Sequence, residues 1–168
     1  MLTISELDAN SVPETRAADN ELSLITAVRY VLAQSGLAYS EGAVRDLPEL
    51  NAEHFDAKSA VSAFRHSGFE SSYGQMPIRS MRAEHCPAIG FLMSGEAVVV
   101  LGISEGGLFR LRYFTSDTGS RDEELAPDQA ERVLQPYLVL ARKVHKAASV
   151  RGKNDWFWGS LLQGRWLY

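Results

Sequence analysis

The pattern of apolar and polar positions divides the chain into a helical N-terminal part and a strand-rich C-terminal part. Apolar residues recur at helical spacing and are followed by a glycine at a helix-ending position: Leu22, Ile25, Val28, Leu32 and then Gly36. This pattern predicts a first helix over Glu21–Ser35. A short second helix is predicted over Glu41–Asp46, with Ser40 as its N-cap. A third is predicted over Asp56–His66 from its amphipathic spacing.

Strand-like patterns dominate from Glu70 onward. Two apolar runs, Cys86–Met93 and Ala97–Ile103, flank a tight turn and predict a central hairpin of buried strands. Further strands are predicted over Glu70–Gln75, Leu108–Phe114 and Pro136–Val144. A polar loop (Thr115–Arg121) and one or two helical turns (Pro127–Val133) are predicted between the last two of these. This order indicates an α+β fold, with helices packed on an essentially antiparallel meander.

The two ends of the chain differ from the middle. Residues 1–20 are polar and predict a flexible lead-in, so the domain itself is expected to span residues 21–144. Residues 145–168 are basic at first and then rich in tryptophan, a combination that suits a membrane surface. A C-terminal helix docked on the domain's own core is the alternative. We expect this segment to lead towards a missing transmembrane domain, with Trp156–Tyr168 poorly ordered without it.

Composition narrows the class of protein. The chain has 168 residues, 45% of them hydrophobic and 23% charged, and a net charge of −4, which suits one globular domain. No basic patch with interleaved aromatic residues suggests a nucleic-acid partner. No secretory signal and no apolar run long enough to span a bilayer is present, so the isolated domain is expected to be soluble. A single cysteine fits a reducing compartment and rules out an internal disulfide.

A search for catalytic chemistry finds little. Cys86 is the only thiol and His85 is its neighbour, but adjacent strand residues point to opposite faces and cannot pair as nucleophile and base. Cys86 is therefore predicted to be structural. The remaining histidines, His54, His66 and His145, lack partners at metal-ligand spacing, and no metal site is predicted. The acidic run Asp122–Glu124 is predicted to be a solvated loop.

The order of short motifs resembles one family. VLAQSG ends the first predicted helix, and PAIGFL, GEAVVVLG, SDTG, YLVLAR and NDWFWG follow in that order. This resembles the N-terminal cytoplasmic peptidase-like domain of ABC transporters of type I secretion systems. That domain is related to the double-glycine leader peptidases of bacteriocin exporters, and the resemblance implies a papain-like fold. The DWFWG ending looks most like the exporters of large RTX adhesins.

The resemblance also locates a catalytic triad that this chain lacks. Active relatives carry a cysteine in the first helix, a histidine that opens the second hairpin strand and an aspartate after the next strand. The matching positions here are approximately Thr26, Ala97 and Thr115, and none of these residues can take those roles. In the haemolysin type, an aromatic residue packs on the histidine. The matching residue is Phe91, which is a candidate for lining the former substrate cleft.

The resemblance therefore implies a degenerate, non-catalytic domain that docks unfolded RTX-type cargo during export. The expected partners are the cargo, the transporter's own transmembrane and nucleotide-binding domains, and indirectly a periplasmic adaptor; the transporter is expected to be a homodimer. The expected location is the cytoplasmic face of the bacterial inner membrane. The residues expected to lie next to the membrane are Trp156, Phe157, Trp158 and Trp166. No cofactor is expected in this chain, with ATP and Mg²⁺ only in the nucleotide-binding domain.

Two alternatives stay open from the sequence. One is an active cysteine peptidase that cleaves a leader peptide and uses Cys86. The other is a regulatory or scaffold domain that binds its own transporter or a signalling partner and never touches cargo.

Overall fold

The computed structural model describes residues 12–47, 54–115 and 119–144. Within that part the helices are α1 (Val12–Gln34), α2 (Glu41–Arg45), α3 (Ala57–His66) and α4 (Pro127–Val133), with 3₁₀ turns η1 (Ile78–Ser80) and η2 (Ala83–His85). The strands are β1 (Phe69–Gln75), β2 (Ala88–Leu92), β3 (Ala97–Ile103), β4 (Phe109–Phe114), β5 (Ser120–Leu125) and β6 (Leu134–Lys143). No helix in these ranges combines the length and apolarity needed to cross a bilayer.

The strands form one six-stranded antiparallel sheet in the order β1-β6-β2-β3-β4-β5. The prediction of a meander is therefore wrong in one respect, because β6 returns to lie between β1 and β2. The reason lies in β6 itself. Leu138, Val139 and Leu140 are consecutive and all buried, so both faces of this strand must be covered. An interior position also gives its backbone hydrogen-bond partners on both sides.

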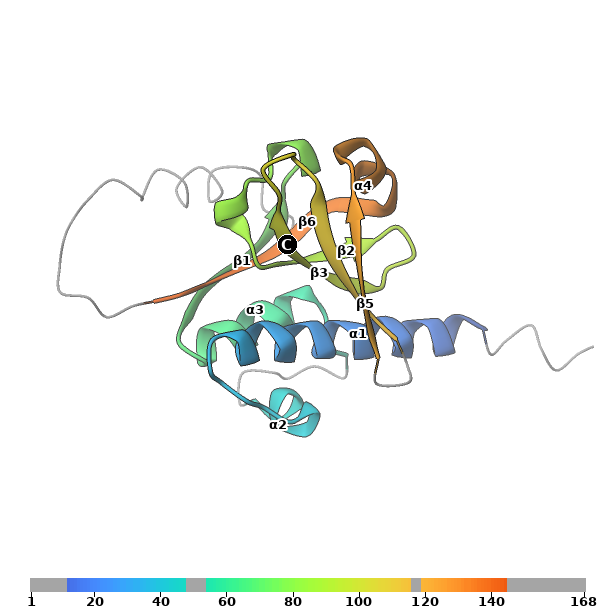
Figure 1. The fold of residues 1–168 in the computed structure, drawn as a ribbon. Helices are drawn as coiled ribbons and strands as arrows, with labels where there is room; N and C mark the ends of the chain where they lie inside the picture. Colours follow the sequence, from blue (N-terminus) through green and yellow to red (C-terminus); the bar gives the residue numbers. More distant parts are fainter. Residues whose placement is uncertain (1–11, 48–53, 116–118, 145–168) are drawn as a thin grey trace, which may run out of the picture.

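The sheet separates two apolar cores, one on each face (Figure 1). In β3, Ala97 and Val99 face the core shared with α1, α2 and α3, whereas Val98 and Val100 face the core covered by η1, η2 and α4. Successive strand residues point to opposite faces, so a strand buried on both sides reads as one continuous apolar run. This explains the run from which the central hairpin was predicted.

Helix α1 begins at Val12, so residues 12–20 are helical and that part of the predicted lead-in is wrong. Residues 14–19 are exposed, which is why no apolar stripe marked them as helix. Their helix begins with Pro13 in its first turn, where proline is tolerated, and continues through good helix formers. Residues 1–11 lie outside the described residues, as do residues 145–168 with the predicted membrane-proximal side chains.

The turn between β2 and β3 packs closely against α1. Gly95 has a φ of 99°, a conformation that glycine adopts without strain. A Cβ atom at this position would lie 2.5 Å from Nδ2 of Asn20. The polar first half of α1 is thus held against the start of β3.

Several strand bounds also differ from prediction; β6, for example, spans Leu134–Lys143 where Pro136–Val144 was predicted. The segment from Ser120 to Leu125 is strand β5, although its residues were predicted to belong to polar and solvated loops. It lies at the sheet edge, where charged side chains are stable because solvent reaches both faces. Strand β2 begins at Ala88 rather than Cys86, because η2 occupies the residues just before it. The predicted N-cap of α2 is confirmed, because Ser40 Oγ accepts from Ala43 N at 3.1 Å. Asp56, predicted as the first residue of the third helix, is instead the N-cap of α3, where its Oδ1 accepts from Ser59 N at 2.8 Å.

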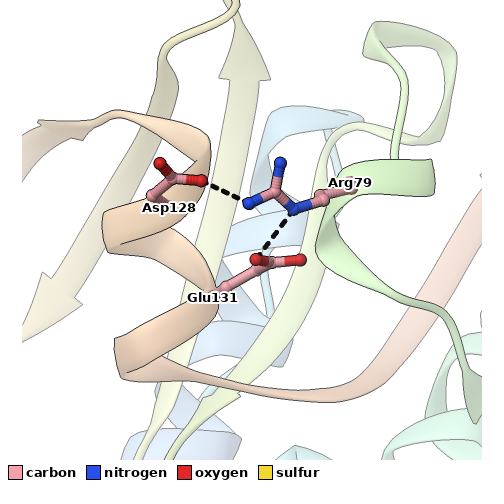
Figure 2. A network of polar contacts seen from close by, with 3 residues as sticks. All are labelled: Arg79, Asp128 and Glu131. Carbon is pink, nitrogen blue, oxygen red and sulfur yellow. Dashed lines mark hydrogen bonds and ion pairs between the residues drawn. The ribbon is translucent and has the colours of Figure 1, made fainter.

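An ionic network on the face away from α1 connects η1 to α4 (Figure 2). Arg79 of η1 contacts both Asp128 and Glu131, the latter at 2.8 Å between Nε and Oε2. The two carboxylates are three residues apart in α4, so one guanidinium reaches both. The side chains of Arg79 and Asp128 are largely solvent-exposed and that of Glu131 is 36% exposed, and screening by water keeps such pairs weak. The ion pairs connect η1 to α4, while the buried side chain of Ala130 packs α4 onto the apolar core of the sheet.

Candidate functional site

An open cleft of about 890 Å³ lies between α1 and the β4–β5 hairpin. From α1 it is lined by residues at helical spacing along one face: Asp19, Leu22, Ser23, Thr26, Arg29, Tyr30 and Ala33. The other lining residues come from the α1–α2 connection, the start of α2, the β2–β3 turn and the β4–β5 hairpin: Ala38, Tyr39, Glu41, Glu96, Phe114, Thr115, Gly119 and Ser120. One helix face and one hairpin end therefore form its two walls.

The apolar part of the cleft is aromatic. The rings of Tyr30 and Phe114 pack with their centroids 6.1 Å apart at an interplanar angle of 55°. The guanidinium of Arg112 lies 4.8 Å from the centre of the Tyr30 ring, a cation–π arrangement. Arg112 also donates to both carboxylate oxygens of Asp122, at 2.6 and 2.7 Å. These hydrogen bonds hold the pKa of Asp122 below its usual value. The ring of Tyr30 thus contacts both Phe114 and Arg112.

The remainder of the lining is polar. Nε of Arg29 donates to the carbonyl oxygen of Tyr39 at 2.9 Å and so holds the α1–α2 connection beside α1. The carboxylates of Asp19, Glu41 and Glu96 supply negative charge among the lining residues. An apolar floor with a few fixed polar groups around it is typical of ligand sites. A cleft of this volume that stays open to solvent suits a segment of polypeptide.

Two of the three triad positions that the family resemblance gives lie at this cleft. Thr26 and Thr115 both line it, as does Glu96, the neighbour of Ala97. The side chain of Ala97 is itself in the core, with the residue 2% exposed. Residues from the first helix, the turn before the second hairpin strand and the end of the next strand are thus brought together, although they are far apart in the chain.

Ser23 of α1 forms a hydrogen bond with the backbone of Ala97. Its Oγ accepts a hydrogen bond from Ala97 N at 2.9 Å and donates one to the carbonyl oxygen of Asn20 at 2.7 Å. The hydroxyl of Thr26 instead bonds within its own helix, to Leu22 O at 2.8 Å. Sequence reasoning missed Ser23, because helical spacing alone does not show which turn of α1 meets the start of β3.

The cleft lining contains neither cysteine nor histidine. In the described chain, His54 lies beside Glu21, His66 ends α3 and His85 lies on the opposite side of the sheet. A serine or threonine hydroxyl becomes a nucleophile only when a base removes its proton. The hydroxyls of Ser23 and Thr26 donate to backbone carbonyls, which cannot act as such a base. Among the described residues, no group of three or more His, Cys, Asp and Glu could hold a metal ion.

Cys86 lies on the other side of the sheet from the cleft, where it packs against the core beneath η1, η2 and α4. Burial raises the pKa of its thiol to about 11. Its neighbour His85 accepts a hydrogen bond from Arg82 N on Nδ1 at 2.9 Å, and burial lowers the pKa of its imidazole. Cys86 Sγ lies 3.9 Å from Arg82 O. Both side chains therefore contact the backbone of Arg82.

Cys86 is expected to be a slow thiol. With a pKa of about 11, roughly one molecule in a thousand carries the thiolate at pH 8. Labelling by a maleimide at pH 8 should therefore be at least about tenfold slower in the native protein than in guanidinium-unfolded protein. Cys86→Ala should leave the products of incubation with a double-glycine leader peptide unchanged. Native labelling as fast as in the unfolded chain, or cleavage that disappears in Cys86→Ala, would contradict this assignment.

Phe91 lies directly across from Ala97 in the β2–β3 pairing. Its ring packs edge-on against Tyr73, with centroids 6.0 Å apart and an angle of 85° between the planes. Tyr137 stacks beside Tyr73 at 5.9 Å. Phe91 is not among the residues that line the cleft; its side chain packs against the same apolar core that contains Ala97.

Comparison with known proteins identifies the fold. No family model and no curated protein matches the sequence. Solved structures do match. The N-terminal peptidase C39-like domain of the toxin secretion ATP-binding protein from Vibrio parahaemolyticus is 18% identical, with a TM-score of 0.59, over 73% of this chain and 97% of that one. A double-glycine motif protease from an AMS/PCAT transporter, solved in complex with the leader peptide, is 15% identical. The match has a TM-score of 0.60 and covers 73% of this chain and 84% of that one. The chain has the fold of the C39 peptidase domains.

A third structure agrees. The peptidase domain of Streptococcus ComA, a bi-functional ABC transporter of a quorum-sensing pathway, is 16% identical with a TM-score of 0.58, covering 75% of this chain and 94% of that one. The predicted papain-like α+β fold, with helices packed on an antiparallel sheet, is confirmed. At these identities the likeness shows that the chain has the C39 fold. Any inference about activity must come from the residues of the cleft.

Proposed function

We propose that this C39-fold domain is a non-catalytic docking domain of a type I secretion ABC exporter, and that its cleft holds unfolded RTX-type cargo. One observation carries the proposal: the cleft is lined by Thr26 and Thr115, at the positions that the family resemblance gives to the nucleophile and the aspartate of a cysteine peptidase. Ser23 bonds to the backbone of Ala97, and no cysteine or histidine lines the cleft. A site with these groups can bind a polypeptide but has nothing to activate for cleavage.

The cleft lining fits an unfolded chain better than a folded partner. Tyr30 and Phe114 offer aromatic surface to apolar side chains of many kinds. The hydroxyls of Thr115 and Ser120 and the carboxylates around them are polar groups for the cargo backbone. Binding through such groups depends little on sequence and stays weak enough for release, which export requires.

The wider assignment follows from the same proposal. The solved neighbours are domains of ABC transporters or proteins of toxin secretion, which supports transmembrane and nucleotide-binding domains as further partners. In this proposal the transporter is a homodimer, the domain lies at the cytoplasmic face of the inner membrane, and a periplasmic adaptor is an indirect partner. ATP and Mg²⁺ belong to the nucleotide-binding domain.

A titration of the full chain with a calcium-free RTX-repeat polypeptide tests the proposal. RTX repeats fold around Ca²⁺, so the calcium-loaded polypeptide is a matched folded control. We expect backbone NMR shifts at Tyr30, Phe114 and Thr115 with the calcium-free form and none with the loaded form. The affinity should be micromolar, at a Kd of about 10–100 μM. Absence of shifts at a polypeptide concentration of about 500 μM would contradict docking at this cleft.

A further inference from the structure

The two edges of the sheet are not equivalent. At the β1 edge, Arg65 of α3 donates from both Nε and Nη2 to the carbonyl oxygen of Ser71, at 3.1 and 3.0 Å. That oxygen is therefore unavailable to another strand. At the opposite edge, every residue of β5 except Leu125 is exposed. A sheet edge with free backbone groups is a template for pairing with another chain.

The pairing with β4 shows which backbone groups of β5 face outward. Thr115 N donates to Gly119 O at 3.0 Å, and the register continues from there without a bulge. Hydrogen-bonded and non-hydrogen-bonded pairs alternate in an antiparallel ladder. The N–H and C=O groups of Arg121 and Glu123 consequently point to β4, and those of Ser120, Asp122 and Glu124 point away from the sheet.

The charges of β5 are compensated within the hairpin. Charged side chains often protect sheet edges by repelling a second strand. Here Asp122 is held by Arg112, Arg121 lies 3.5 Å from Glu123, and Glu124 is opposite Arg110 in the register. Each carboxylate thus has a basic neighbour, which lowers the electrostatic cost of placing another strand beside β5.

The open edge is continuous with the cleft. Ser120 lines the cleft and is also the first residue of β5, so a polypeptide that leaves the cleft at Ser120 meets this edge. Backbone hydrogen bonds of an added strand require an extended chain but no particular side chains. An unfolded cargo chain supplies such a backbone over its whole length.

We propose that an extended segment of unfolded cargo adds to β5 as a further strand, bonded to the outward N–H and C=O groups of Ser120, Asp122 and Glu124. The inference rests on the proposed function and names how that function is carried out: the cleft holds one part of the cargo, and the edge holds the next by its backbone. The occupant is the cargo polypeptide, and a second copy of this chain is the competing occupant.

Amide hydrogen exchange of the full chain tests the edge directly. With calcium-free RTX-repeat polypeptide at saturation, exchange at Ser120, Asp122 and Glu124 should slow by about tenfold or more. The variant Glu124→Pro removes one outward N–H without touching the β4 ladder, because edge positions with solvent-facing N–H groups tolerate proline. It should weaken binding by about tenfold. Glu124→Ala keeps the N–H and removes only the carboxylate, so its affinity should stay within about twofold of the parent.

The possible results separate the two proposals. Shifts in the cleft with unchanged exchange at the three outward amides would overturn strand addition and leave docking in the cleft intact. If the cleft residues show no shifts and exchange at the three outward amides is unchanged, both docking in the cleft and strand addition at β5 are overturned. Protection that appears without cargo and increases with protein concentration would show that a second copy occupies the edge. Equal affinities of Glu124→Pro and Glu124→Ala would also contradict a backbone-bonded strand, and the exchange measurement on the parent does not depend on the folding of either variant.

Discussion

Replacing Thr26 with tryptophan is expected to weaken the binding of calcium-free RTX-repeat polypeptide by at least about tenfold. Thr26 stands in the middle of the α1 residues that line the cleft, and its side chain is only half-buried. An indole at this position would occupy the space beside Tyr30 and Phe114 that the cargo is proposed to use. Tryptophan and threonine have similar helix propensities, so α1 itself should persist.

A tryptophan elsewhere on the same helix is the matched control. Gln34 is exposed at the end of α1 and does not line the cleft. Gln34→Trp should therefore keep the parent affinity within about twofold, as measured by the same NMR titration. If both variants bind as the parent does, the cargo does not use this cleft. If both lose binding alike, the effect comes from an added indole rather than from its place.

Local pattern predicted the helices and the central strand well. Strand β3 has the bounds that the sequence predicted, Ala97–Ile103, because turn residues mark both of its ends. Helix α3 was predicted within one residue, because its stripe and its Asp56 cap are both local signals. Where a segment is defined by its own spacing and caps, sequence alone suffices to place it.

Long-range pairing was not predictable in the same way. The position of β6 between β1 and β2 depends on contacts with residues far away in the chain. Strand β5 carries no apolar alternation, because it is an edge strand whose stability comes from pairing with β4. A loop was predicted there because the segment is polar. The sequence does not show the cross-strand contact between Arg112 and Asp122 that supports the strand.

The candidate site shows the same division. The resemblance placed Ala97 and Thr115 near each other, and the fold brings their surroundings to one cleft. It set the first-helix position at about Thr26, whereas the α1 residue that accepts a hydrogen bond from Ala97 N is Ser23, one turn earlier. A helix presents a different residue to its neighbour with each turn, so this contact is known only once α1 is placed on the sheet.

Ser23→Ala is expected to lower the free energy of unfolding by about 1–3 kcal/mol, because it leaves a buried backbone donor without a partner. Ala97 is 2% exposed, and its N–H donates to Ser23 Oγ at the very start of β3. Alanine has no side-chain acceptor to offer to this N–H group. Urea unfolding followed by circular dichroism would measure the change.

Thr26→Val provides the comparison on the same helix. It also removes a hydroxyl, but that hydroxyl donates only to Leu22 O, a carbonyl that the helix ladder already uses. Its cost should stay below about 0.5 kcal/mol. A Ser23→Ala cost as small as that of Thr26→Val would show that the Ser23–Ala97 bond does not hold α1 to β3. A large difference between the two would mean that Ser23 stabilises the fold at the position where the helix meets the second hairpin strand. In that case the serine has a structural reason to be there, and its place beside Ala97 needs no catalytic one.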